Sequence, residues 1–357
     1  MTSAVLPPPV STGVAGHALQ PTGAASSRTA KRLIALSLLV TLGFGVWMRL
    51  ALTGSVSMGL DFAHLRHAHS HLGAYGVLFP LAFLAWQARG APTPGPRAMT
   101  VYALATALAV VGFLRAGYGP EAIVGSTVVG GLWLWSAFRL RRFVLRLDAP
   151  LALVPPGIVA AMACVPFIAL TLRKDPVFAH QLVATFLSTL LLVVITPSAL
   201  AAIGARAWAS PALAVAGLLG TASLGVWSAP ASRLGLAVYG LWLASVALQR
   251  SLAPVLRAAW GAVGLGLLSM AVELVPNQRP AVLGALHFLV LGPVLLSLLP
   301  TLWRAPPRWA QWVLLGFVAL AAAPLVAQSL GVYASTLQLS ALGGALVLGW
   351  WLAVLRR

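Results

Sequence analysis

The stretch HLRHAHSHLGAYGVLFPLAFLAW, residues 64–86, joins a segment with four histidines to a long apolar run. The chain has only seven histidines in 357 residues, so this stretch holds more than half of them. An α-helix needs about 20 predominantly apolar residues to cross the hydrocarbon core of a bilayer. We therefore interpret the stretch as part of a membrane helix that carries histidines in its first turns.

The overall composition also predicts an integral membrane protein. Hydrophobic residues make up 60% of the chain and charged residues 8%, whereas soluble domains carry about 25% charged residues. The net charge of +18 reflects scarce acids and arginines in short loops, so we expect lipid contact and no nucleic-acid binding. Cys164 is the single cysteine, which excludes an intramolecular disulfide and a cysteine-based metal cage.

Apolar runs of membrane-spanning length recur about twelve times along the chain. Long unbroken runs indicate helices, because the strands of a membrane barrel alternate in polarity over about ten residues. Residues 1–30 are predicted to be a disordered tail, and residues 31–357 a single transmembrane domain. The expected spans are residues 31–53, 62–88, 97–117, 120–145, 151–172, 176–204, 208–228, 232–250, 254–275, 280–303, 308–329 and 334–355.

Basic residues predict the orientation of these spans. Most of the 23 lysines and arginines fall at the two ends of the chain or in the loops after even-numbered spans. These positions share one side of the membrane if the spans number twelve. The positive-inside rule then places both termini in the cytoplasm, in a multi-pass protein of a bacterial-type inner membrane.

The histidine-bearing spans recur at a regular interval. The cluster at 64–71 opens the second span, His180 opens the sixth, and His287 lies in the first half of the tenth. All three spans start on the outer face, and their spacing of four predicts a threefold repeat of four-helix units. Each span also carries a later proline: Pro80, Pro197 and Pro300. The expected repeat units are residues 31–147, 150–250 and 254–357.

The helical spacing of the cluster predicts two faces. At about 100° per residue, His64, His67 and His71 share one face, and His69 points nearly the opposite way. An imidazole in hydrocarbon is costly and is usually paired, hydrogen-bonded or bound to something. Neutral imidazole is the commonest metal ligand, and two facing histidines can hold a haem iron. A purely interfacial role, with hydrogen bonds to loop carbonyls or water, is the simpler alternative.

Two motifs in the cluster resemble a known family. LRHAH, residues 65–69, resembles the Leu-Arg-x-x-His segment on helix 2 of haem-copper oxidase subunit I. AHSHLGAYG, residues 68–76, is similar to a segment of smaller oxidase-like membrane proteins, and NnrS-type haem and copper proteins have a related motif. Twelve helices in three four-helix arcs match the architecture of that superfamily.

The resemblance implies a b-type haem near the outer face. His69 and His287 would be its axial ligands, and Arg66 would contact a carboxylate of the haem. The resemblance also implies an incomplete oxygen-reducing centre, because Ala285 replaces one expected histidine and residues 208–228 contain none. The implied function is electron transfer or a response linked to nitric oxide or oxygen, with an electron-donor protein or quinol as partner.

The other histidines, and the chain as a whole, allow alternative interpretations. His64, His67, His71 and His180 could bind a second metal, with copper favoured by clustered imidazoles without thiolates, or could line the haem carboxylates. The chain could instead be a copper or other metal transporter or chaperone without haem. A secondary transporter is a third alternative, although a threefold repeat argues against it. Two acids precede histidine-bearing helices and could orient an imidazole, but helix capping is favoured: Asp61 and Asp175.

Overall fold

The structure of the protein is a computed structural model. It describes residues 24–92, 94–144, 151–171, 174–205, 229–276, 278–333 and 335–356. Within these ranges every regular element is a helix. Nine of the described helices are long and apolar enough to cross a membrane. The chain is therefore an all-helical protein of the multi-pass membrane type.

The nine helices coincide with nine of the predicted spans. Two further predicted spans, 62–88 and 232–250, are also helical but are not among the nine. The predicted span at 208–228 lies outside the described residues. The nine membrane-crossing segments are Lys31–Leu52, Pro96–Ala116, Pro120–Phe143, Leu151–Ile168, Val177–Ala202, Pro254–Ala271, Arg279–Thr301, Arg308–Ser329 and Thr336–Leu355.

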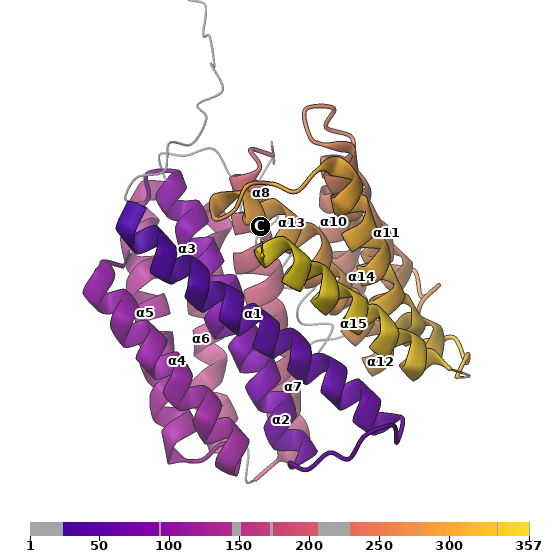
Figure 1. The fold of residues 1–357 in the computed structure, drawn as a ribbon, viewed down its shortest axis with the longest axis horizontal. Coiled ribbons are helices and arrows are strands. Elements are labelled where there is room, and N and C mark those ends of the chain that lie inside the picture. The colour runs from indigo at the N-terminus through magenta and orange to yellow at the C-terminus, as the bar shows by residue number, and fades with distance from the viewer. Residues whose placement is uncertain are drawn as a thin grey trace, which may run out of the picture.

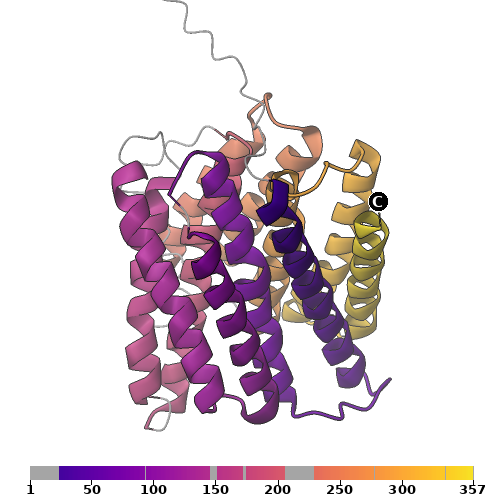
Figure 2. The ribbon, with the colours of Figure 1, turned by 60° about the vertical axis from the view of Figure 1, so that its left-hand side comes forward.

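Most helices pack beside their neighbours in the chain. α4 (Pro96–Ala116) packs on α5 (Pro120–Val144), and α14 (Arg308–Ser329) packs on α15 (Thr336–Leu355). The first described helix, α1 (Ala24–Leu52), lies against the last one, α15 (Figure 1). Figure 2 shows the helices running alongside one another through the molecule. Two more pairs of chain neighbours pack together: α10 (Ala229–Ala247) with α11 (Pro254–Ala271), and α5 with α6 (Val154–Thr171).

Three long helices contain a π-helical segment part-way along their length. In the first, α2 (Phe62–His71) continues through η1 (Leu72–Leu78) into α3 (Phe79–Ala88). The later parts of all three contact one another, and Trp86 Nε1 of α3 donates a hydrogen bond to Ser198 Oγ of α8 at 2.8 Å. The other two helices are α7 (Pro176–Thr189), η3 (Leu190–Ile195) and α8 (Thr196–Ala202), and α12 (Arg279–Leu289), η4 (Val290–Val294) and α13 (Leu295–Leu298).

The prolines of these helices lie near the π-helical segments. Pro80 and Pro197 each lie in the first turn of the α-helix that follows the segment. In the third helix Pro293 lies inside the segment itself. Pro300, the position expected from the sequence, lies instead in the short 3-10 helix η5 (Leu299–Thr301).

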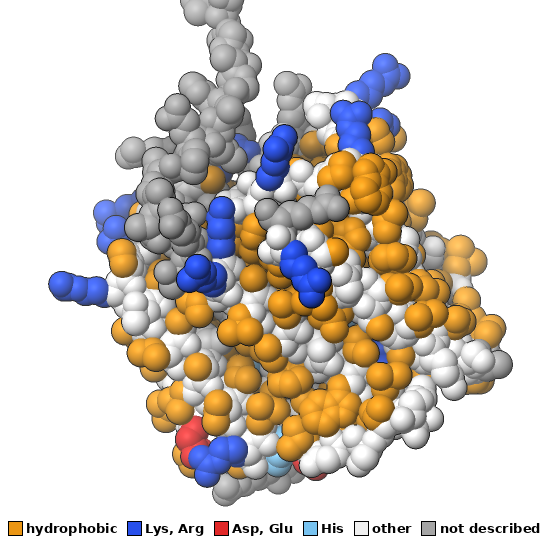
Figure 3. All heavy atoms as spheres, viewed as in Figure 1, with side chains coloured by type: hydrophobic (Ala, Val, Ile, Leu, Met, Phe, Trp, Pro, Cys, Tyr) orange, Lys and Arg blue, Asp and Glu red, His pale blue; other side chains and the backbone are white. Residues whose placement is uncertain are grey.

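The surface has a hydrophobic band between two different ends. On the face seen in Figure 3, lysine and arginine side chains gather towards the upper edge, near the C-terminal end of α15 marked in Figure 1. Acidic and histidine side chains appear at the lower edge beside one basic group, and hydrophobic side chains cover much of the region between. This distribution matches a membrane-embedded bundle with one strongly basic end.

Close helix contacts at glycine give a first prediction. A Cβ added at Gly343 of α15 would lie 2.3 Å from the backbone nitrogen of Ala321 in α14, whereas a Cβ at Gly349 would meet nothing within 4 Å. Overpacking of this kind costs about 1–3 kcal/mol. We expect Gly343→Ala to lower the thermal unfolding midpoint in detergent. Gly349→Ala is the control, because it raises helix propensity equally; equal midpoints would contradict the packing argument.

Candidate functional site

Two histidines from distant parts of the chain face each other. His69, in α2, and His287, in α12, have ring centroids 6.3 Å apart and ring planes inclined by only 17°. The labels of both helices lie in the lower part of Figure 1, below the centre of the bundle. The structure therefore brings together the two residues that the sequence motifs paired.

A backbone carbonyl fixes the tautomer of each ring in its neutral form. His69 Nδ1 lies 2.8 Å from the carbonyl oxygen of Thr41 in α1, and His287 Nδ1 lies 2.7 Å from that of Leu283. A carbonyl can only accept, so each Nδ1 must carry the proton. Each neutral ring then has a lone pair on Nε2, and no described residue forms a hydrogen bond with either Nε2. Metal-binding histidines characteristically show this arrangement.

The spacing of the rings suits one shared metal ion. A ring nitrogen lies about 1.15 Å from the centre of an imidazole, and metal–nitrogen bonds are about 2.0 Å long, so two imidazoles on opposite sides of one metal have centroids about 6.3 Å apart. The observed separation of His69 and His287 has this value. The centroid separation and the small angle between the ring planes are therefore compatible with binding of one metal ion between the two imidazoles.

The surroundings of the pair carry positive charge. Arg49, near the end of α1, lies within electrostatic reach of both His69 and His287. Arg66, one turn before His69, lies within reach of Arg279, the first residue of α12. Two guanidinium groups close together favour an anionic partner, and guanidinium binds carboxylates through two parallel hydrogen bonds. The arginines therefore give this end of the bundle groups that can bind an anion.

The other histidines of the cluster lie on the opposite face of α2. They pack against the last turn of α4 and the loop that follows it, whereas His69 faces α1 and α12. This confirms the two-faced arrangement predicted from helical spacing. His71 also receives support within α2, because its Nδ1 lies 2.9 Å from the carbonyl oxygen of His67. The contacts are His64 with Gly117, His67 with Tyr118, and His71 with Phe113.

The described residues contain no group of three or more His, Cys, Asp or Glu side chains that could hold a metal ion. The rings of His67 and His71 are 6.3 Å apart but inclined by 62° and surrounded by aromatic rings. His180 lies in α7, and its side chain lies outside the described part of the chain. The structure thus gives no support to a copper site formed by these histidines, within the residues that it describes.

The two acids before the histidine-bearing helices act as caps. Asp61 Oδ1 accepts a hydrogen bond of 2.9 Å from the backbone N–H of His64, which lowers the pKa of this carboxyl group below its ordinary value. Asp175 Oδ1 accepts one of 3.0 Å from the backbone N–H of Phe178. Both carboxylates therefore stabilise the start of a helix, as the capping interpretation predicts.

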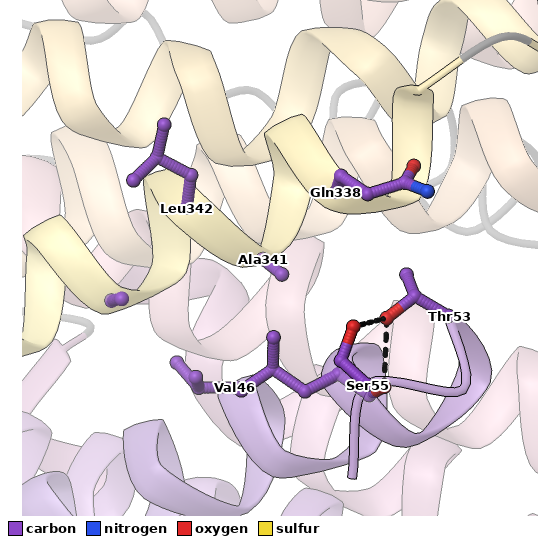
Figure 4. A pocket seen from close by; sticks show the side chains of 8 residues that line it. Val46, Thr53, Ser55, Gln338, Ala341 and Leu342 are labelled. Atoms are coloured by element: carbon purple, nitrogen blue, oxygen red, sulfur yellow. Dashed lines mark hydrogen bonds between the residues drawn. The ribbon is translucent and has the colours of Figure 1, made fainter.

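A cavity of about 340 Å³ lies between α1 and α15 (Figure 4), and neither His69 nor His287 lines it. Val46 and Leu50 line it from α1, and these residues directly follow Gly45 and Arg49, which lie beside His69. At one end Thr53 Oγ1 and Ser55 Oγ are 2.7 Å apart and hydrogen-bonded. The remaining lining residues come from α15: Gln338, Ala341, Leu342 and Ala345.

Sequence reasoning missed the contribution of α1 to this site. Thr41 supplies a carbonyl, Gly45 leaves room for the His69 ring, and Arg49 brings charge. The three residues are spaced by four, so they lie on one face of the helix. The sequence signal for this contribution was Arg49, a charged residue inside the first apolar run and one turn after Gly45.

Comparisons of the chain with protein-family models, with curated proteins and with solved structures found no match.

Proposed function

We propose that the protein binds one b-type haem between His69 and His287 and transfers electrons through it. The observation that carries the proposal is the facing pair of imidazoles, 6.3 Å apart and nearly parallel. Each ring has Nδ1 committed to a carbonyl and Nε2 left as a lone pair. Such a pair has the donor atoms, the spacing and the tautomers of a bis-histidine site.

The residues of the chain have separate roles in this proposal. His69 and His287 bind the iron, and Thr41 and Leu283 orient the two rings through their carbonyl groups. Arg66 binds a carboxylate of the porphyrin through charge-assisted hydrogen bonds. A bound haem supplies a one-electron couple. Because both axial positions are taken by strong ligands, the proposed activity is electron transfer rather than gas binding at this iron.

The proposal includes the position of the site in the membrane. We place about twelve spans in three four-helix arcs, in an inner membrane with both termini in the cytoplasm. The basic upper end of Figure 3 supports this orientation. The recurrence of a π-helical segment in three helices, two of which carry the facing histidines, supports the repeated arcs. The haem then lies towards the outer face, where an electron-donor protein or a quinol in the bilayer can reach it.

The test is the absorption spectrum of the purified wild-type protein, expressed with an adequate haem supply. We expect a Soret band, sharp α and β bands after reduction, and one haem per chain. A colourless preparation that contains copper would overturn the proposal in favour of a copper transporter or chaperone.

The small angle between the ring planes makes the test sharper. Two nearly parallel imidazoles donate π-electron density to the same iron d orbital, so this orbital and its partner differ in energy. Two perpendicular imidazoles would leave the two orbitals similar in energy. We therefore expect the ferric protein to give a rhombic low-spin electron paramagnetic resonance spectrum. A high-spin signal would contradict coordination by two histidines.

A further inference from the structure

Arg49 and His69 lie over the same glycine of α1. A Cβ added at Gly45 would be 3.1 Å from His69 Cε1 and 3.4 Å from Arg49 Nη1. The charge of Arg49 also acts on His287, on the other side of the proposed iron position. The guanidinium is therefore a near neighbour of the imidazole pair.

The Arg49 side chain points back along α1 and away from its outer end. Nη1 lies 3.3 Å from the carbonyl oxygen of Gly45, one turn earlier in the helix, and 3.6 Å from a Cβ added at Gly344 of α15. An arginine that only escapes the hydrocarbon extends its charged group towards the nearer interface. Arg49 instead directs its charge between α1, α2 and α15.

The described acids do not compensate this charge. Each of them has another partner, either as a helix cap or in an ion pair, and no carboxylate in the described ranges contacts Arg49. A cation in such surroundings acts strongly on its neighbours, because the low dielectric constant screens it little. The four acids and their partners are Asp61 with His64, Glu121 with Arg115, Asp175 with Phe178, and Glu273 with Arg233.

We propose that Arg49 raises the reduction potential of the haem held by His69 and His287. The inference rests on the proposed function. The reduced form of the iron carries one positive charge fewer than the oxidised form, so a fixed cation nearby favours reduction. Arg49 thus acts through its positive charge and does not bind the iron. It leaves the two ligands unchanged and makes the site a better electron acceptor.

The first test compares the midpoint potentials of Arg49→Gln and Arg49→Lys by spectroelectrochemical titration. Arg49→Gln is expected to favour the oxidised form at least about tenfold, a decrease of about 59 mV for one electron. Arg49→Lys, which keeps the charge, should stay closer to the wild type. An unchanged potential in Arg49→Gln overturns the inference, whereas a wild-type protein without haem refutes the proposed function itself.

A second pair of variants covers the case in which Arg49→Gln fails to retain haem. Gly344→Asp introduces a carboxylate beside Arg49, and Gly344→Asn introduces a neutral side chain of the same shape; both have the same steric contact, 3.3 Å from Val46 Cγ2. We expect the Asp variant to have the lower potential, because it neutralises Arg49 in place. Equal potentials in the two variants overturn the inference.

Discussion

His287→Ala is expected to abolish the low-spin haem spectrum, and His69→Ala is expected to do the same. In the proposed site each of the two rings supplies one ligand to a single iron, so removal of either leaves a five-coordinate site at best. The two rings lie 6.3 Å apart between their centroids. Difference spectra and haem quantification of the purified variants measure the effect. We expect haem content to fall about tenfold or more, since loss of a ligand costs more than the 1.4 kcal/mol that corresponds to that factor.

The control for this prediction is His67→Ala. His67 belongs to the same helix, but it packs against Tyr118 on the opposite face, with centroids 4.7 Å apart. Its removal should leave the low-spin spectrum intact. Retention of the spectrum in both His69→Ala and His287→Ala would refute the assigned ligands.

Gly45→Val is expected to weaken haem binding without removing any ligand. A Cβ at this position would approach His69 Cε1 to 3.1 Å, and the branches of valine extend further into the ring. The ring must then move away from the Thr41 carbonyl, which holds its Nδ1. Changes to the groups that orient a metal ligand typically reduce affinity about 10–100-fold. Haem titration of the apoprotein measures this loss.

Gly43→Val provides the matched control in the same helix. A Cβ at Gly43 would meet nothing within 4 Å, and the change in helix propensity is the same. We expect Gly43→Val to bind haem as the wild type does. Equal affinities in Gly45→Val and Gly43→Val would show that room for the ring at Gly45 is unimportant.

Hydropathy and helical spacing predicted the features that depend on one helix at a time. The bounds of nine spans followed from apolar runs, because desolvation in lipid acts on each segment independently. The separation of His69 from His64, His67 and His71 followed from the rotation of about 100° per residue. The closeness of His69 to His287 came from the motif resemblance, since no periodicity links helices so far apart in the chain.

The features that depend on packing between helices could not be predicted in this way. The contribution of α1 requires its rotation about its own axis, which the contacts with α2 and α15 determine. Sequence reasoning did not single out Arg49, whose guanidinium lies beside the same glycine, Gly45, as the His69 ring. The π-helical segments were also missed, because they have no simple hydropathy pattern and only the prolines mark their neighbourhood.

Each π-helical segment changes the direction in which the side chains after it face, relative to those before it. A π-helical segment holds one residue more than the same length of α-helix. The side chains that follow it are therefore rotated about the helix axis by about 100°. The early turns of α2 can therefore point His69 at its partner, while Trp86 in α3 independently reaches Ser198 in α8. Substitutions in the first half of these helices that change which ligand is bound therefore need not disturb the contacts among α3, α8 and α13.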